Sequence, residues 1–188
     1  MVGPLFYVKT IHMKKIIFIF FLFFSLQGIA QQFPTLVCEN MNDKKVTIPD
    51  DVKGRKTVVA MAMSAKAEKS LRAWNTPLYN SLIADGMGGL MSGRMYDANL
   101  CFVGMVKGIA KLATSEIKER TKKNTDKKLH DNFMISDQNV NDFAKEVNIK
   151  DTGEPQFFVL DANGKIIYHT SGNYTDDKLN AITEKLMQ

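Results

Sequence analysis

Cysteine is scarce in this sequence of 188 residues, and its two cysteines, Cys38 and Cys101, form no Cys-x-x-Cys motif. Dithiol exchange needs one thiolate to attack and a second thiol within reach to resolve the mixed disulfide. Histidine is scarce too, and neither His130 nor His169 has another histidine or a carboxylate at the spacing of metal ligands. The sequence therefore lacks the usual dithiol motif, and it indicates no cofactor.

No apolar run is long enough to cross a bilayer, which takes about 20 residues. The run at residues 16–26 follows Lys14 and Lys15 and precedes small residues that end at Ala30, an order typical of a secretory signal peptide. We therefore predict upstream residues and a signal peptide over 1–30, and one domain over 31–188. Cleavage near Ala30 would leave the protein periplasmic or secreted, in a Gram-negative type of bacterium, with membrane contact only before cleavage.

Aromatic residues are missing from the main basic cluster of the sequence. Binding of single-stranded nucleic acid needs aromatic side chains among the basic ones, so that bases can stack. Signal-peptide cleavage also lowers the net charge from +5 to +2, because residues 1–30 contain three lysines and no acidic residue. We predict no nucleic-acid binding and assign the cluster to a solvated helix face; its members are Lys118, Arg120, Lys122, Lys123, Lys127 and Lys128.

Segments typical of strands and helices alternate along residues 31–188. Apolar runs over 57–63 and 100–106 are typical of buried parallel strands, and a short strand is predicted at 133–135. A helix is predicted from about Ala67, with Pro77 expected to kink or interrupt it. Further helices are predicted over 109–122 and after Asp137, which we expect to cap its helix. The alternation predicts an α/β fold with right-handed crossovers.

The most informative stretch, residues 153–168, combines a proline, a strand, a tight turn and a second strand. Its turn is Asp161-Ala162-Asn163-Gly164, and the Asn-Gly pair readily takes the positive φ angles of a hairpin. A helix with Thr175 as its N-cap follows the second strand. This assembly resembles the C-terminal half of the thioredoxin-like superfamily, particularly its secreted thiol-oxidoreductase and peroxiredoxin-like (redoxin) branch.

The resemblance implies a thioredoxin-like three-layer α/β/α sandwich with a mixed central sheet, a C-terminal antiparallel hairpin and a closing helix. It also implies a cis peptide bond before Pro155. In this family the two reactive cysteines lie between the first core strand and the first helix. The corresponding residues here, 67–70 or in a second register 69–72, contain no sulfur. Residues 73–77 also resemble the mitochondrial ATP synthase assembly factor of the same superfamily, over a segment too short to imply a function.

Sulfur-containing residues elsewhere in the chain leave two alternatives open. Because an exported chain meets an oxidising compartment, Cys38 and Cys101 are a candidate disulfide, whose loop would stabilise the fold by about 4 kcal/mol in the chain-entropy account. The simpler interpretation of Cys101 is a small buried hydrophobic residue. Met87, Met91 and Met95 are spaced by four in a glycine-rich segment. Thioethers favour Cu(I), so a Met-rich copper carrier is one interpretation, and filling of gaps under a loop is the other.

Binding without redox chemistry is the function that these observations favour. In thioredoxin-like proteins the backbone beside the cis-proline pairs with an extended substrate chain, a contact that needs no cysteine. We predict a redox-inactive binding or assembly module for an extended peptide or partner protein in the periplasm, with its oligomeric state left open. The alternative is a thiol-disulfide oxidoreductase or redoxin that uses Cys38 or Cys101. The predicted contact residues are Ser64, Lys66, Glu68, Ser70, Glu154 and Pro155.

Overall fold

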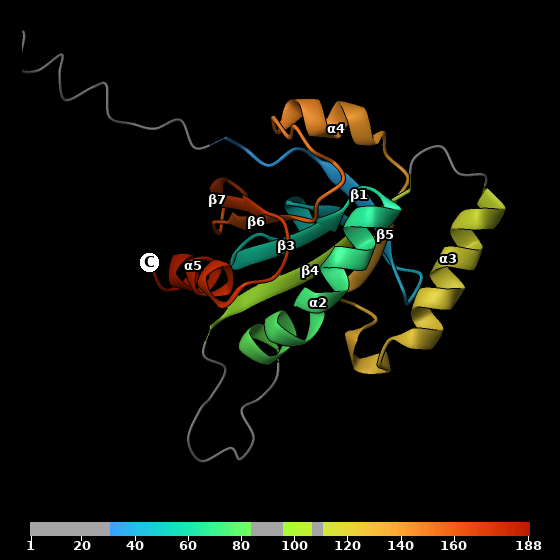
Figure 1. The fold of residues 1–188 in the computed structure, drawn as a ribbon, viewed down its shortest axis with the longest axis horizontal. Coiled ribbons are helices and arrows are strands. Elements are labelled where there is room, and N and C mark those ends of the chain that lie inside the picture. Colours follow the sequence, from blue (N-terminus) through green and yellow to red (C-terminus); the bar gives the residue numbers. More distant parts are fainter. Residues whose placement is uncertain (1–30, 84–95, 107–110) are drawn as a thin grey trace, which may run out of the picture. The chain divides into compact units, whose positions relative to one another are not determined.

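The structure is a computed structural model that describes residues 31–83, 96–106 and 111–188, with side chains of the helix that begins at 111 described from residue 114 onward. A mixed sheet of seven strands lies at its centre, in the order β2-β1-β5-β4-β3-β6-β7 (Figure 1). The strands are β1 (Leu36–Asn40), β2 (Lys45–Ile48), β3 (Lys56–Ala62), β4 (Ala98–Met105), β5 (Phe133–Ser136), β6 (Gln156–Leu160) and β7 (Ile166–Ser171). The helices are α2 (Ala65–Leu82), α3 (Lys111–Asn124), α4 (Val140–Glu146) and α5 (Asp176–Met187).

Helices cover both faces of the sheet. On one face, α2 and α5 pack against β3, β4 and β6, where Trp74, Phe102 and Phe157 belong to one core. On the other face, Val140 and Phe143 of α4 belong to a second core. Successive side chains of β3 and β4 alternate between these two cores, because the side chains of a strand point to opposite faces. The predicted three-layer α/β/α sandwich is therefore confirmed.

The strand directions also follow the prediction. The pairs β3–β4 and β4–β5 are parallel, whereas β6 is antiparallel to both β3 and β7. The C-terminal hairpin and the closing helix α5 are thus in place. An antiparallel hairpin of β1 and β2 extends the sheet beyond β5, and this hairpin was not predicted. Within the described residues, no helix is long and apolar enough to span a membrane.

Two local predictions about helices, an interruption at Pro77 and an N-cap at Asp137, were wrong. Helix α2 begins at Ala65 and continues through Pro77 to Leu82, so the proline does not interrupt it. The apolar face of α2 is buried on both sides of Pro77, and this packing offsets the hydrogen bond that proline cannot donate. The N-cap of α4 is Asn139 and not Asp137, because the Asn139 side chain accepts a hydrogen bond from the backbone N–H of Asn141 at 2.9 Å.

The β6–β7 turn uses one positive φ angle where the Asn-Gly pair suggested two. Gly164 has φ of 83°, whereas Asn163 is not among the residues with positive φ. The Asp161 carboxylate stabilises the turn instead, since its Oδ1 accepts hydrogen bonds from the N–H groups of Asn163 and Lys165 at 2.8 and 2.9 Å. Asp161 therefore contributes the side-chain bonding typical of an Asx turn. The predicted N-cap Thr175 is confirmed, because its side chain accepts from Lys178 N.

Candidate functional site

Ser64 occupies the N-terminal end of α2, the part of the fold at which the thiols of the resembled family are expected. Its backbone is extended, and its Oγ accepts a hydrogen bond from Ala67 N at 3.2 Å. The same hydroxyl donates to the carbonyl oxygen of Thr152 at 3.0 Å. Ser64 therefore caps the helix and also joins it to the loop that precedes β6.

Because α2 begins earlier than predicted, the positions at which reactive thiols would be expected also lie earlier in the sequence. Because the helix begins at Ala65, the cap and the first three helical residues are residues 64–67. The two predicted registers, 67–70 and 69–72, start three and five residues after the cap. A thiolate is activated at the helix N-terminus itself. Residues 64–67 contain no cysteine, so the corrected register also lacks sulfur.

The structure does not bring the other predicted contact residues of α2 together. Lys66 is exposed beside the loop before β6, since a Cβ added to Gly153 would lie 3.5 Å from Lys66 Cδ and Nζ. Glu68 points along the helix and pairs with Arg72 at 2.8 Å. Ser70 is partly exposed in the second turn. Ser64 and Lys66 thus lie next to the loop at residues 151–154, whereas Glu68 belongs with Arg72.

The prediction that Pro155 follows a cis peptide bond was wrong. Among the described residues the cis bond lies between Ile48 and Pro49, so the Glu154–Pro155 bond is trans. Local sequence does not decide this isomer, and trans is favoured by about 0.5–1 kcal/mol before proline. A trans proline is also well tolerated next to the first residue of a strand, and β6 begins at Gln156.

The backbone around Pro155 is already paired within the chain. Gly172 N donates to the carbonyl oxygen of Pro155 at 3.0 Å, and Gln156 Nε2 donates to the carbonyl oxygen of Glu154 at 3.1 Å. Pro155 itself is buried. The Glu154 side chain is exposed, and its Oε2 accepts from Ser171 Oγ at 3.4 Å. The carboxylate of Glu154, rather than the backbone of Pro155, is therefore open to an outside partner.

Both cysteines are free thiols, buried in the core that faces α4. Burial and, to a smaller extent, the electrostatic effect of Cys101 raise the pKa of Cys38 to about 12. Burial alone raises the pKa of Cys101 to about 12. Strand β5 lies between β1 and β4. Two strand spacings amount to about 9–10 Å, which exceeds the roughly 7 Å between Cα atoms that a disulfide can span. The candidate Cys38–Cys101 disulfide is absent from this structure.

Metal-binding groups do not gather in the described parts of the chain, where no cluster of three or more His, Cys, Asp or Glu could hold an ion. His169 instead stacks on Phe158 with ring centroids 4.5 Å apart, and its Nε2 lies 2.9 Å from Gln156 Oε1. Burial lowers the pKa of His169. The residues of the copper alternative, Met87, Met91 and Met95, lie outside the described residues, as does the predicted signal peptide of residues 1–30.

A pocket of about 840 Å³ opens between α2 and α3, over strands β4 and β5. Phe102, Gly104 and Phe133 contribute to its lining from the sheet. Ser64 and Glu68, two of the predicted contact residues, line it from α2. The pocket therefore adjoins the N-terminal end of α2, and sequence reasoning missed it.

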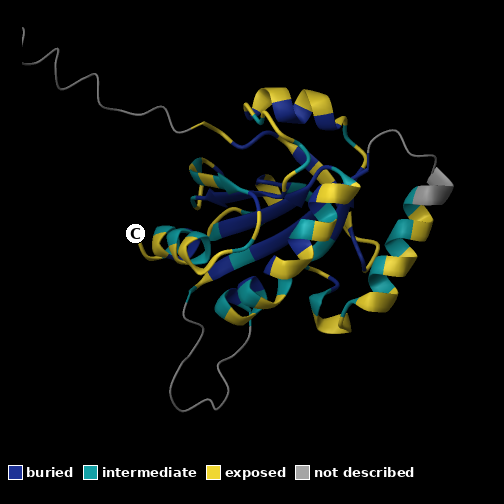
Figure 2. Cartoon of the chain, viewed as in Figure 1, coloured by how far each residue is buried: buried dark blue, intermediate teal, exposed yellow. Residues whose placement is uncertain are grey.

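The composition of α3 explains why a pocket exists there. Ile117 is the apolar residue that this helix contributes to the core among its described side chains, and none of these side chains is buried (Figure 2). The part of α3 whose side chains are described has too narrow an apolar face to pack closely along a sheet. The low apolar content of residues 114–124 is thus the sequence signal that could have indicated an open space.

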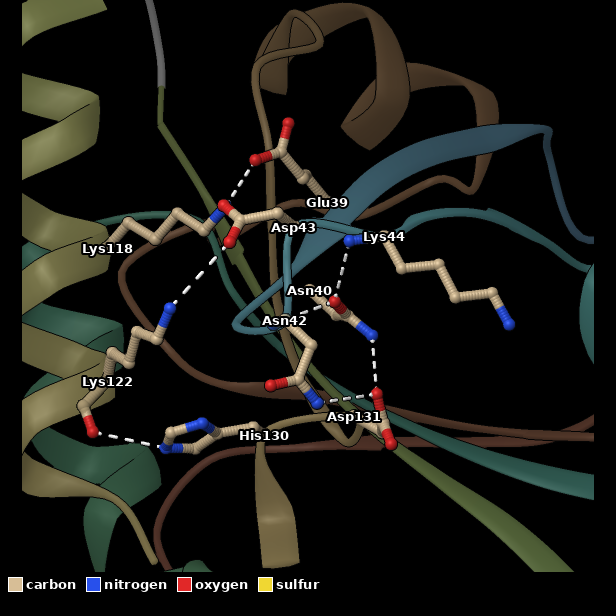
Figure 3. Close-up of polar contacts among 9 residues, drawn as sticks. All are labelled: Glu39, Asn40, Asn42, Asp43, Lys44, Lys118, Lys122, His130 and Asp131. Atoms are coloured by element: carbon tan, nitrogen blue, oxygen red, sulfur yellow. Dashed lines mark hydrogen bonds and ion pairs between the residues drawn. The ribbon is translucent and has the colours of Figure 1, made fainter. Parts of the chain in front are cut away.

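Ion pairs hold α3 to the β1–β2 hairpin (Figure 3). Lys118 Nζ pairs with Glu39 and, at 2.5 Å, with Asp43, while Lys122 Nζ lies 3.7 Å from Asp43 Oδ2. The hydrogen bond and the charge of Lys118 lower the pKa of Asp43. At the end of the helix, the buried His130 places Nε2 3.2 Å from the carbonyl oxygen of Lys122. Polar contacts thus replace much of the apolar packing that α3 lacks.

The turn that carries Asp43 is fixed by the buried amide of Asn40 (Figure 3). Asn40 Oδ1 accepts from the N–H groups of Asn42 and Lys44 at 2.9 and 3.0 Å. Asn40 Nδ2 donates to Asp131 Oδ1 at 2.9 Å. These three bonds hold the turn in place, so that Asp43 meets the lysines of α3.

Comparisons with known proteins agree with this fold. The family model described as ATP10 protein matches residues 23–187, whereas no curated protein matches the sequence. The chain is similar in structure to the pneumococcal exposed lipoprotein thioredoxin Etrx1 of Streptococcus pneumoniae TIGR4, with 15% identity over 82% of this chain and 98% of that chain and a TM-score of 0.54. It is similar to StoA of Bacillus subtilis, with 20% identity over 80% of this chain and 97% of that chain and a TM-score of 0.52. These likenesses establish a thioredoxin-like fold.

Proposed function

The chain belongs to the ATP10 protein family, and on that basis we propose that it is an exported binding or assembly protein that acts without thiol exchange. The thioredoxin-like fold is established, but a fold alone does not specify a function. The role is therefore our proposal. Its support comes from the N-terminal end of α2, from the buried positions of the two cysteines and from the family match.

The observation that carries the proposal is the chemistry of Ser64. Its hydroxyl is committed to capping α2 and to the carbonyl oxygen of Thr152. Cys38 and Cys101 are buried in the core that faces α4. With a pKa of about 12 each, these thiols supply almost no thiolate near neutral pH. The side chains at the exposed end of α2 are therefore suited to contact with a partner and not to electron transfer.

The contact surface that we propose consists of Ser64, Lys66 and Glu154. Lys66 and Glu154 are exposed, and Ser64 connects α2 with the loop between them. Because the backbone of Pro155 is paired internally, we expect a partner to bind through side chains of this surface rather than by adding a strand at Pro155. An extended peptide or a partner protein in the periplasm is the proposed occupant.

Export is the second part of the proposal. It is supported by the two lysines, the apolar run and the small residues that precede residue 31. N-terminal sequencing of protein recovered from the periplasm tests it, and we expect a chain that begins close to Gln31. A chain recovered there with its first residues intact would contradict cleavage near Ala30.

Site-specific photo-crosslinking in exporting cells tests the contact surface. A photoreactive amino acid replaces Lys66 in one variant and, as a matched control, Lys145, an exposed lysine of α4 on the opposite face of the sheet. We expect a discrete protein adduct from position 66, lower adduct yield when Glu154→Lys is added, and no adduct from position 145.

A variant without cysteines distinguishes binding at this surface from thiol chemistry. The variant Cys38→Ala/Cys101→Ala should give the same adduct from position 66, because neither thiol belongs to the contact surface. Equal adducts from positions 66 and 145, or an adduct that disappears without cysteines, would contradict the proposed function.

A further inference from the structure

The floor of the α2–α3 pocket is set by one glycine in β4. Phe102 and Gly104 alternate along the strand with Val103 and Met105, which belong to the core that faces α4. A Cβ added to Gly104 would meet no atom within 4 Å. The pocket side of β4 is therefore open in front of Gly104, in a strand whose neighbouring positions are fully packed.

The size of this space and the character of its walls suit a small molecule. Pockets that bind small ligands typically measure about 300–1,000 Å³ and combine an apolar lining with a few polar groups, and this one measures about 840 Å³. Leu71 and Ile117 supply apolar surface from the two helices, and Phe102 supplies it from the sheet. Asn75 and Arg120 supply polar groups from α2 and α3.

Asn75 presents an unsatisfied acceptor among the residues that line the pocket. Its Oδ1 is buried and has no hydrogen-bond partner within the part of the chain that the structure describes. Buried polar atoms are nearly always paired, because an unpaired one loses its bond to water without replacement. Because Asn75 lines the pocket but its Oδ1 is closed to solvent, a ligand donor would satisfy this oxygen once the side-chain amide turns toward the pocket.

The charge of the lining favours an anion. Glu68 and Arg72 pair with each other at 2.8 Å, so their charges offset one another. Arg120 is exposed and takes part in none of the ion pairs found in the described residues. A guanidinium binds a carboxylate or sulfonate through two parallel hydrogen bonds. Arg120 is therefore the group on which an acidic head would be held.

We propose that this pocket binds a small amphipathic anion, with its apolar body against Phe102 and Gly104, its acidic head at Arg120 and a hydrogen-bond donor at Asn75 Oδ1. The site adjoins the proposed protein-contact surface, because Ser64 lines the pocket too, but the residues that would bind the anion, namely Gly104, Asn75 and Arg120, are not part of that surface. Photo-crosslinking at Lys66 and ligand binding in the pocket can therefore fail independently.

Binding of 8-anilinonaphthalene-1-sulfonate to the purified protein tests the proposal, since this probe joins an aromatic body to an N–H donor and a sulfonate. We expect saturable fluorescence at one site, displaced by octanoate but not by octanol, which has the same chain without the charge. Arg120→Gln should weaken binding about tenfold, while the matched control Arg55→Gln, on a surface arginine outside the pocket lining, should leave binding unchanged.

A variant whose added side chain fills the pocket gives a second, steric test of the proposal. Gly104→Phe should abolish probe binding while the protein still unfolds cooperatively, because the added ring enters open space. Amide NMR of the unaltered protein gives a readout that needs no variant: octanoate should shift the Gly104 N–H and the Asn75 side-chain amide. Unchanged binding in Gly104→Phe, equal displacement by octanol, or no shift at Gly104 would each overturn the proposal.

Discussion

The Ser64 hydroxyl donates a hydrogen bond of 3.0 Å to the carbonyl oxygen of Thr152, while it accepts one from the backbone at the start of α2. This contact ties the first turn of the helix to the loop that leads into β6. The bond lies at the end of the helix where the reactive thiols of a thioredoxin-like protein are expected, and residues 64–67 contain no cysteine. Ser64 therefore has a structural role at this end of the helix.

Ser64→Ala should lower the free energy of unfolding by about 1–2 kcal/mol, because it removes an N-cap and leaves the Thr152 carbonyl oxygen without this donor. Urea denaturation followed by circular dichroism measures the change. Ser70→Ala is the matched control, since Ser70 lies within α2 and caps nothing, and its effect should stay within about 0.5 kcal/mol. A Ser64→Ala variant as stable as the unaltered protein would contradict the capping role.

The buried thiols predict a loss of stability at high pH. In the unfolded chain a cysteine titrates near its ordinary value, about 8.5, whereas Cys38 and Cys101 titrate at about 12 in the folded protein. Between these values the folded state holds more protons than the unfolded state, so the free energy of unfolding falls as pH rises. Below the unfolded value the contribution is fully present.

Comparison of the unaltered protein with Cys38→Ala/Cys101→Ala isolates this effect from the titration of lysines and tyrosines. The double variant should show a flatter decline of unfolding free energy from pH 9 upward. At pH 8 both thiols of the native protein should resist a thiol-specific reagent until denaturant is added. Rapid labelling of either thiol in the native state would show that the burial assigned to it is incorrect.

The attachment of α3 should be electrostatic and sensitive to salt. Lys118→Met removes the pairing with Glu39 and Asp43, so backbone amides of α3 should exchange with solvent faster, while those of α4 should not change. The control is Lys123→Met, because Lys123 forms no ion pair within the described residues. Salt at about 1 M, where the screening length is roughly 3 Å, should reproduce part of the effect in the unaltered protein.

The lowered pKa of Asp43 gives the direction in which stability changes at acid pH. The Lys118 hydrogen bond and charge lower the pKa of Asp43, so the pairing stabilises the fold above the ordinary pKa of an aspartate and loses its effect as pH falls. Protection of the α3 amides should therefore decrease below about pH 4, near the unperturbed aspartate value. Asp43→Asn should remove most of that pH dependence, and an identical pH profile in this variant would contradict the role of Asp43.

Trp74 joins α2 to the segment after β7, because its Nε1 donates to the carbonyl oxygen of Gly172 at 3.1 Å. Trp74→Phe should lower the free energy of unfolding by about 2–4 kcal/mol, since it leaves a buried acceptor unpaired and a space beside Phe157. Tyr174→Phe, which removes a surface hydroxyl, should cost far less. Urea denaturation of both variants makes the comparison, and equal losses would contradict the importance of the Gly172 bond.

Features that depend on neighbouring residues in sequence were predictable. The cap at Thr175 and the hairpin of β6 and β7 follow from local patterns, and so does the burial of Trp74, which shares one helix face with Leu71 and Leu78. The alternation of strands and helices then restricts the topology to few choices. These local patterns are why the three-layer fold could be inferred.

Features that depend on distant parts of the chain were not predictable. The isomer of Pro155 and the separation of Cys38 from Cys101 depend on how segments far apart in sequence come together. The pocket depends on how little apolar surface residues 114–124 of α3 bring to the side of β4 that carries Gly104. Ser64 was named as a contact residue, but its role as a cap became clear only once the true start of α2 was known.

An insulin-reduction assay with dithiothreitol tests most directly the claim that this thioredoxin-like end binds without exchanging electrons. The unaltered protein should reduce insulin at the background rate. The variant Ser64→Cys/Ala67→Cys, which restores two thiols at the helix N-terminus, should exceed that rate and shows that the assay can detect the chemistry. A rate above background for the unaltered protein that is lost in Cys101→Ser would contradict the account.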